Sequence, residues 1–277
     1  MTHPNRLFYL CPPDYYQIEY AINPWMDLNN RVQPERAMAQ WQTLYDTYCR
    51  LGVHVEIIPP EPGRSEMTFP GDSIFLFGKT AISSRFRHPE REPEVAPMAQ
   101  RFAERGYTIH TLPPGLHFEG NAEAIYFHGK LFCGYGIRSD HAVFAHIGQL
   151  LNVEAHTFQL AKPFYHFDVT FCPIDRDLAV YYPGAFTLES AERLRSLFPQ
   201  MIEVEEAEAQ QLGCNSVSVN GVVVMSTPRA PKLATELRAR GQDVIELDLS
   251  EFYKAGGGAK CLTLEAYRPQ AQGGATV

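Results

Sequence analysis

One arrangement of strands and helices recurs along the chain, and it limits the possible folds more than any other feature. Two short apolar runs around a turn are followed by a helix-like segment and then by a further apolar run. The paired runs are residues 73–84, 124–136, 169–182 and 216–226. In the last of them an Asn-Gly pair stands at the turn, which is the strongest short signal for a β-hairpin. The sequence therefore predicts a hairpin, a helix and a strand, in this order, four times.

The segments after the hairpins carry helix boundary signals. Thr187 and Glu189 suit the start of a helix over 187–198, and Gly241 suits the end of a helix over 230–241. The other two helices are expected over 90–105 and 139–151, and the closing strands in "GYTIHTL", "VEAHTFQL", "MIEVE" and "DVIELDL".

A fifth unit has to be assembled from both ends of the chain. "KCLTLE" (260–265) supplies one strand and "RLFYLCPP" (6–13) pairs beside it. A helix over 34–51 and the strand "VHVEIIP" (53–59) complete the unit, with Pro34 and Gly52 suiting the helix ends.

Repeats with a period near 45 residues are typical of propeller-like arrays. We therefore predict an α/β fold, a five-bladed pseudo-symmetric propeller whose ring is closed by the N- and C-terminal strands. Residues 1–268 are expected to form one domain. A disordered tail is expected over 269–277, which is rich in Gly, Ala and Gln and has no apolar period.

Composition excludes several classes of function. The chain has 277 residues and a formal net charge of −8, which argues against binding nucleic acid or an anionic membrane. Residues 1–15 lack the apolar stretch of a signal peptide, and no run approaches the length of a membrane span. We expect a cytoplasmic protein.

The six cysteines are scattered without CxxC spacing, so free thiols are expected. None of the ten histidines forms an HxxxH pattern or a Cys/His cluster with zinc-like spacing. No metal and no cofactor is expected.

Five polar residues stand just before the hairpins at nearly constant intervals. They are Asp72, Glu119, His166, Asn215 and Cys261, separated by 47, 47, 49 and 46 residues. If the five units are equivalent, these side chains point toward one centre. An imidazole, two carboxylates, an amide and a thiol would then meet in a single site.

Cys261 is the candidate nucleophile of that site. It follows the glycines 256–258, where a backbone without Cβ atoms lets a ligand approach closely. Asp168 lies two residues after His166, so on a strand both side chains would share one face. The plainer alternatives are loop carboxylates at Asp72 and Glu119. For Asn215, a hydrogen bond to backbone at the strand entrance is the favoured interpretation.

With these residues in view, the sequence resembles the guanidine-modifying enzymes of the pentein superfamily, and most closely their bacterial arginine dihydrolase and deiminase-like branch. The resemblance spans nearly the whole chain. It rests on "YAINPWM" (20–26), "FEG" (118–120), "YHFD" (165–168), "TFCP" (170–173) and "GGGAKCLTLE" (256–265), in the family's order and spacing.

The resemblance implies a cysteine-dependent hydrolase acting on carbon–nitrogen bonds of linear amidines. Cys261 would attack the guanidinium carbon and form a covalent amidino-thioether. His166, oriented by Glu119, would protonate the leaving amine and then activate water. Asp72 and Asp168 would accept the guanidinium NH groups.

The resemblance also implies partners for the far end of an amino-acid substrate. Arg91 and Arg138 correspond to arginines that bind the substrate carboxylate, a task that suits a bidentate guanidinium. Asn23 would add a polar contact. The expected ligand is a small cationic guanidine such as arginine, and pairing of two copies into a homodimer stays open.

Several reactions fit this resemblance. Dihydrolases of this branch carry Asn where Asp72 stands, so hydrolysis of arginine or a close derivative to a ureido product and ammonia is the leading prediction. The family's acidic residue after the catalytic Glu is usually Asp, and here it is the longer Glu123. The alternatives are dimethylargininase, arginine dihydrolase, which continues to ornithine, and amidinotransferase. A non-catalytic pentein binding protein is the alternative outside the enzymes.

Overall fold

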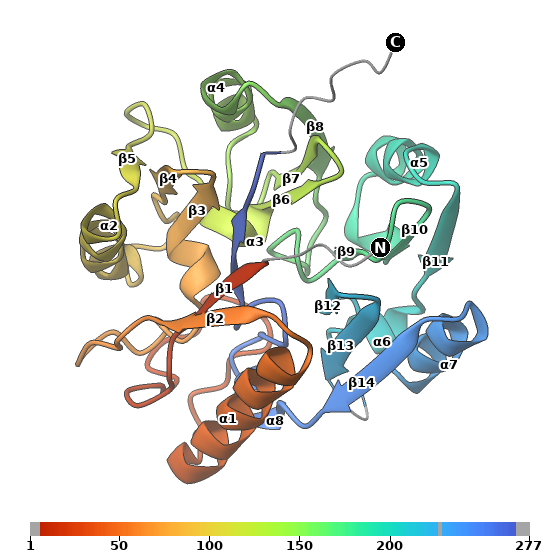
Figure 1. The fold of residues 1–277 in the computed structure, drawn as a ribbon, viewed down its shortest axis with the longest axis horizontal. Coiled ribbons are helices and arrows are strands. Elements are labelled where there is room, and N and C mark those ends of the chain that lie inside the picture. Colours follow the sequence, from red (N-terminus) through yellow and green to blue (C-terminus); the bar gives the residue numbers. More distant parts are fainter. Residues whose placement is uncertain (1–5, 227–228, 270–277) are drawn as a thin grey trace.

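Four units of one kind make up most of the molecule. The computed structural model describes residues 6–226 and 229–269, and the fold is mixed α/β (Figure 1). In each unit the first two strands pair antiparallel, and the third pairs parallel with the second. The strands are β3 (Ile74–Phe77), β4 (Thr80–Ser83), β5 (Thr108–His110), β6 (Ala124–Phe127), β7 (Lys130–Tyr135), β8 (Glu154–Gln159), β9 (Phe171–Pro173), β10 (Leu178–Tyr181), β11 (Gln200–Glu203), β12 (Val217–Val219), β13 (Val222–Ser226) and β14 (Asp243–Leu247).

A fifth unit with the same pairing joins the two ends of the chain. Strand β15 (Leu264–Tyr267) pairs antiparallel with β1 (Leu7–Leu10), which pairs parallel with β2 (His54–Ile57). Strand β15 also pairs parallel with β3, which gives a six-stranded sheet in the order β2-β1-β15-β3-β4-β5. The predicted assembly of this unit from both termini is therefore confirmed.

The strand expected over 260–265 begins later than predicted. Residues 259–262 form a turn, because Leu262 N donates to Gly258 O at 3.2 Å and Thr263 N donates to Lys260 O at 2.9 Å. Cys261 thus lies in a turn ahead of β15.

The longer helices lie at the periphery and the sheets lie nearer the middle, as Figure 1 shows. Pro34 occupies the start of the first helix, and the Thr187 hydroxyl accepts from Ser190 N at 3.4 Å at the start of α5. The helices are α1 (Pro34–Arg50), α2 (Val95–Glu104), α3 (Gly120–Glu123), α4 (His141–Leu151), α5 (Leu188–Ser196), α6 (Glu206–Ala209), α7 (Pro231–Ala239) and α8 (Ser250–Tyr253), with 3₁₀ turns η1 (Pro70–Ser73), η2 (Glu92–Glu94) and η3 (Pro183–Ala185).

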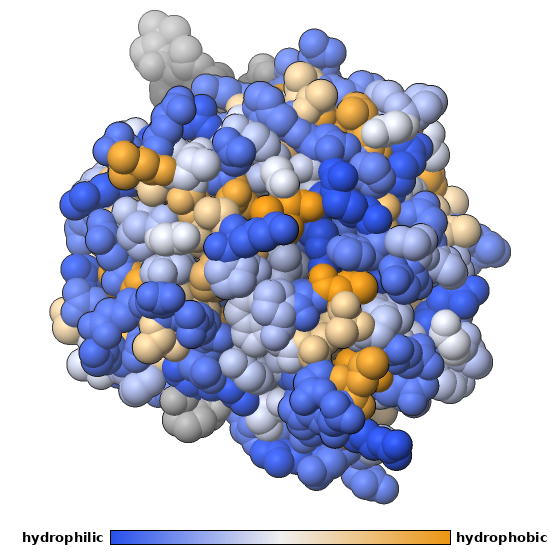
Figure 2. All heavy atoms as spheres, turned by 180° about the vertical axis from the view of Figure 1, so that it is seen from behind, coloured by the Kyte–Doolittle hydropathy of each residue, from blue (hydrophilic) through white to orange (hydrophobic). Residues whose placement is uncertain are grey.

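The inner strands carry much of the core. All four residues of β3 are buried, because β3 lies between two other strands and is covered on both faces. The reverse face, shown in Figure 2, is mostly hydrophilic with small separate hydrophobic groups, as is ordinary for a protein surface. In the part of the chain that the structure describes, no helix has the length and apolarity needed to cross a membrane. Most of the expected tail, residues 270–277, lies outside the described residues.

Candidate active site

The five polar residues at constant spacing all lie just before the first strand of a unit, and all are buried. Asp72 lies in η1, and Glu119 directly precedes α3. The other three lie in turns or irregular backbone ahead of β9, β12 and β15. Because the chain enters each unit in the same way, residues far apart in sequence reach one region.

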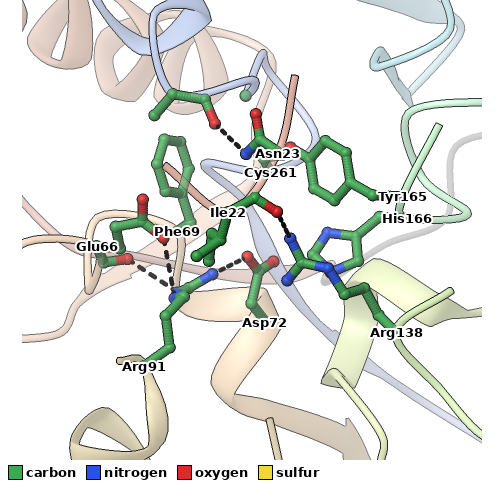
Figure 3. A pocket seen from close by; sticks show the side chains of 12 residues that line it. Ile22, Asn23, Glu66, Phe69, Asp72, Arg91, Arg138, Tyr165, His166 and Cys261 are labelled. Atoms are coloured by element: carbon green, nitrogen blue, oxygen red, sulfur yellow. Dashed lines mark hydrogen bonds and ion pairs between the residues drawn. The ribbon is translucent and has the colours of Figure 1, made fainter. Parts of the chain in front are cut away.

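A narrow pocket occupies this region, with a cavity of about 10 Å³, which is room for about one water molecule. Figure 3 shows side chains from several units pointing into it. Its lining residues are Ile22, Asn23, Glu66, Phe69, Asp72, Arg91, Arg138, Tyr165, His166, Ala255, Gly257 and Cys261.

Cys261 is held mainly by Asn215. The Asn215 amide nitrogen donates to Cys261 Sγ at 3.1 Å, and its oxygen accepts from Cys261 N at 3.2 Å. The same oxygen accepts from Gly258 N at 2.9 Å. The interpretation of Asn215 as only a backbone partner at a strand entrance is therefore wrong, because it also contacts the thiol.

The thiol is protonated in this setting. Burial raises the pKa of Cys261 well above its usual value, and the carboxylates of Asp168 and Asp72 raise it further. Cys261 Sγ lies 3.4 Å from Asp168 Oδ2, which suits an S–H donor. A cation bound beside the sulfur would act in the opposite direction and favour the thiolate.

His166, Glu119 and Arg138 form a buried chain of charged groups. His166 Nε2 lies 2.6 Å from Glu119 Oε2, and Arg138 Nη1 donates to the same oxygen at 3.0 Å. Burial opposes charge on His166, but the bond to Glu119 and the nearby Asp72 outweigh it and raise the pKa of the imidazole. Burial alone would raise the pKa of Glu119, yet His166 and Arg138 lower it to about 2. The pair is thus an imidazolium beside a carboxylate.

Three buried polar atoms at the site have no hydrogen-bond partner among the described residues: Asp72 Oδ1, Asp168 Oδ1 and His166 Nδ1. Buried polar atoms usually have partners, so the two carboxylate oxygens suit a ligand with N–H groups, whereas Nδ1–H of the imidazolium would donate. Burial raises the pKa of Asp168 to about 7. Asp168 does not line the pocket itself but lies behind Cys261.

The prediction that His166 and Asp168 share the face of a strand is wrong. Residues 166–170 form bends and turns ahead of β9, with Thr170 N donating to Phe167 O at 3.0 Å. Asp168 N also donates to Ala122 O at 2.9 Å. The turn, and not a strand pleat, brings both side chains to the site.

Both predicted arginines line the pocket, and both are bound to carboxylates of the protein. Arg91 forms ion pairs with Glu66 at 3.1 Å, with Glu94 at 2.8 Å and with Asp72. Arg138 pairs with Glu119, and its other nitrogen donates to Ile22 O at 2.8 Å. Glu94 lies three residues after Arg91, whereas Glu66 and Asp72 come from η1 and the segment before it.

Asn23 lines the pocket, but its side chain holds backbone. Its amide nitrogen donates to Ala255 O at 2.9 Å, and its oxygen accepts from Trp25 N at 3.0 Å. The segment 20–26 is thereby fixed to the backbone just before the three glycines.

The glycines pack closely against protein side chains, although Gly257 also lines the pocket. A Cβ at Gly257 would lie 2.4 Å from the Phe69 ring, and one at Gly258 would lie 2.9 Å from Asn215 Oδ1. The close approach of a ligand to these glycines stays a prediction, because the side chains named here occupy only the places where a Cβ would lie. Their smallness lets the backbone pack against Phe69 and Asn215.

Sequence reasoning missed Glu66 and undervalued Glu123 and Asn215. Glu66 precedes η1 by four residues and had no family motif to mark it, and burial raises its pKa to about 8. Burial likewise raises the pKa of Glu123 to about 8, and its Oε2 accepts from Phe167 N at 3.2 Å. Only the constant spacing pointed to Asn215. Within residues 6–226 and 229–269, no group of three or more His, Cys, Asp or Glu side chains is arranged to hold a metal ion.

Comparison with known proteins shows the family to which the chain belongs. Residues 16–268 match the family described as N,N dimethylarginine dimethylhydrolase, eukaryotic. The chain belongs to this family. Its expected place among the pentein guanidine-modifying enzymes is therefore confirmed.

Two curated relatives lie at similar distance. The N(G),N(G)-dimethylarginine dimethylaminohydrolase of Mycobacterium tuberculosis is 36% identical over 268 residues, covering 96% of this chain and 87% of the relative. The bifunctional arginine dihydrolase/ornithine cyclodeaminase AgrE of Nostoc sp. is 36% identical, covering 95% of this chain. The chain spans only 38% of the length of AgrE.

Solved structures show the same fold. One of them is the N-terminal domain of ArgZ bound to product, described as an arginine dihydrolase of cyanobacteria. It has a TM-score of 0.91 and is 34% identical, and the match covers 96% of this chain and 100% of that one. A dimethylarginine dimethylaminohydrolase adduct, at 16% identity, has a TM-score of 0.79 and covers 95% of this chain and 99% of that one, which bears on the fold alone.

Proposed function

We propose that this chain is a cysteine-dependent hydrolase of the guanidino group of arginine or a close arginine derivative. One observation carries the proposal: Cys261, the His166–Glu119 pair and the unpartnered oxygens of Asp72 and Asp168 meet at one buried site. A guanidinium carbon is a weak electrophile, and this set supplies a nucleophile, an acid and acceptors for the NH groups.

In the first step Cys261 attacks the guanidinium carbon. The bound cation lowers the thiol pKa, which reverses the effect of burial and of the two aspartates. The Cys261 thiol loses its proton to solvent water, the resulting thiolate forms the S–C bond, and His166 protonates the departing nitrogen. Ammonia, or an alkylamine from a methylated substrate, leaves, and an amidino-thioether remains on Cys261.

In the second step water replaces the thiol. His166, now neutral, takes a proton from the water that attacks the amidino carbon, and the S–C bond breaks. The products are the ureido compound and the Cys261 thiolate, which takes up a proton from solvent water when the product leaves. Glu119 and Arg138 hold the imidazole in place throughout.

The carboxylate end of arginine would bind Arg138 and Arg91. Both guanidiniums lie at the pocket, and Glu66 beside them is an acceptor for an ammonium group. The cavity is smaller than arginine, so binding requires some lining side chains to shift.

Two relatives support different versions of the reaction. AgrE is named as an arginine dihydrolase, and the M. tuberculosis protein is named as a dimethylarginine dimethylaminohydrolase. We favour a single hydrolysis that ends at the ureido product, because Asp72 places an anion beside the substrate nitrogen. Dihydrolysis to ornithine is the second candidate, and amidinotransfer and a binding protein without catalysis remain alternatives.

The experiment is incubation with arginine, dimethylarginine, agmatine and canavanine, with products separated by mass. Citrulline with ammonia from arginine would support one hydrolysis, and ornithine would support two. Dimethylamine from dimethylarginine would favour dimethylargininase. No turnover of any substrate, together with no alkylation of Cys261 by a haloacetamidine, would contradict the proposal.

We also propose that the five units form a closed five-bladed propeller over residues 1–268. The identical pairing in all five units and the pairing of β15 with both β1 and β3 support this arrangement. A homodimer stays a prediction from sequence.

A further inference from the structure

A second cavity, of about 330 Å³, lies among the inner strands of the molecule. Its walls come from β6, β9, β12 and β15, which lie around the middle of Figure 1. The pocket at Cys261 is built just before these strands begin, and the two cavities share no lining residue. The volume is at the lower end of the range for small-molecule sites, about 300–1,000 Å³.

The walls of the second cavity are partly apolar and partly polar. Ile125, Phe171 and Val217 present apolar surface, and Ser216 and Tyr267 present hydroxyls. Such a lining suits a ligand with an apolar body and one polar end.

Two of its charged side chains already neutralise each other. Arg6 donates to Glu265 through two hydrogen bonds of 2.8 Å and also to the carbonyl of Ser218. This pair forms a fixed part of the wall and leaves little charge for a ligand. Arg268 is exposed at the edge of the cavity.

Lys260 is different, because its cation has no carboxylate partner within ion-pair distance in the described part of the chain. Only 7% of the surface of Lys260 is exposed, and among the described residues its ammonium makes one hydrogen bond, a long contact of 3.4 Å to Tyr267 Oη. An ammonium has three donors, and burying one without a matching anion is costly. Lys260 lines the second cavity, whereas the next residue, Cys261, lines the first.

We propose that the second cavity binds a small carboxylic acid with an apolar body, whose carboxylate pairs with Lys260. The carboxylate would accept from the Lys260 ammonium and from Tyr267 Oη, and the apolar body would lie against Phe171, Ile125 and Val217. A single buried cation matches a monoanion. A phosphate dianion would need a second unpaired cation deep in the cavity, and Arg6 is already paired.

The test is calorimetric titration of the full-length protein with benzoate and with benzamide, its uncharged counterpart of the same shape. The wild type is expected to bind one benzoate per chain, at least about tenfold more tightly than benzamide. Lys260→Met should weaken benzoate binding by at least about tenfold, and Lys260→Arg should keep most of the wild-type affinity. The control is Lys79→Met, because Lys79 is exposed, and this variant should bind benzoate with unchanged affinity. The readout is binding, so it is independent of the guanidine chemistry at Cys261.

A filling variant locates the ligand even if Lys260→Met does not fold. Ser218→Phe places a ring in the cavity wall and should remove benzoate binding, with folding checked by circular dichroism. The proposal is overturned if the wild type does not bind benzoate at millimolar concentration or binds benzamide equally well. Unchanged affinity in a folded Lys260→Met or Ser218→Phe variant would also overturn it.

Discussion

Cys261 is held by contacts from distant parts of the chain. Asn215, from the turn ahead of β12, bonds to both its sulfur and its backbone nitrogen. Asp168, from the turn ahead of β9, lies 3.4 Å from the sulfur. A sulfur held in this way has little freedom, which would favour a fixed line of attack if Cys261 acts as the proposed nucleophile.

Replacing Cys261 with Ala is expected to abolish turnover, by a factor on the order of a thousand or more, because no covalent intermediate can form. Release of ammonia from the best substrate measures this. Cys49→Ser is the matched control, since Cys49 is exposed and should leave the rate unchanged. Turnover retained in Cys261→Ala would exclude the covalent route.

Glu123 is expected to make stability depend on pH. Burial raises its pKa from 4.5 to about 8 in the folded protein, so between these values the unfolded chain loses a proton that the folded chain keeps. Its contribution to stability therefore falls as pH rises through this window. Glu123→Gln should remove this loss. The difference in melting temperature between the variant and the wild type should therefore be larger at pH 8 than at pH 5, by about 2 °C or more.

The control for this comparison is Glu154→Gln, since the Glu154 side chain is 68% exposed. Its melting temperature should follow the wild type at both pH values. An advantage of Glu123→Gln that is equal at pH 5 and pH 8 would mean that Glu123 does not titrate as described.

At the scale of elements, the site depends on the short turns that precede the first strands. Each turn delivers one polar side chain and then leads into a buried strand. The segment before β15 is crowded, because Gly257 and Gly258 pack directly against Phe69 and Asn215. A change in such a turn affects both the site and the packing beneath it.

Gly258→Ala should therefore lower both kcat and the melting temperature. Its Cβ would lie 2.9 Å from Asn215 Oδ1, so Asn215 and the thiol must shift, and a displacement of about 1 Å can cost roughly a hundredfold in rate. Gly241→Ala is the contrast: its φ is +79° and nothing lies within 4 Å, so it should lower stability alone. A rate unchanged in Gly258→Ala would contradict the role of Asn215.

Helix α5 tests the opposite case, an element outside the site. Thr187 caps its start through Ser190 N, and loss of such a cap costs about 1 kcal/mol. Thr187→Ala should lower the melting temperature by about 2–4 °C and leave kcat as in the wild type. A fall in kcat comparable to that of Gly258→Ala would show that α5 is coupled to the site.

At the scale of the whole molecule, the chain ends meet inside one sheet. Strand β1 lies between β2 and β15, and β15 lies beside β3. The first and last strands thus support each other and the first complete unit. Only β15 comes from the C-terminal end, and because it lies between β1 and β3, the sheet cannot be completed from one half of the chain.

We expect thermal unfolding to be a single transition for this reason. Trp25 and Trp41 lie in the N-terminal part of the chain, so tryptophan fluorescence reports there, whereas far-ultraviolet circular dichroism reports on all units. The two melting curves should coincide. Leu10→Ala, which removes a fully buried side chain from β1, should shift both curves equally. Two separate transitions would contradict a single domain.

The sequence by itself determined the units, their order and the residues that stand before each hairpin. These follow from local chemistry: apolar alternation, turn residues and helix boundaries act over a few positions and recur at a constant period. It also singled out Cys261, His166, Glu119 and Asp72, because regular spacing implies equivalent places in equivalent units. The family resemblance added Asp168 to the substrate contacts.

Only the tertiary structure decided how these residues are paired. It bound Arg91 to Glu66, Glu94 and Asp72, and it set Asn215 against the thiol of Cys261. It also placed Lys260 in a different cavity from its neighbour Cys261. These partners come from separate units, and the sign and size of each pKa shift depend on burial and on charges brought close by the fold. No periodicity along the chain encodes those distances.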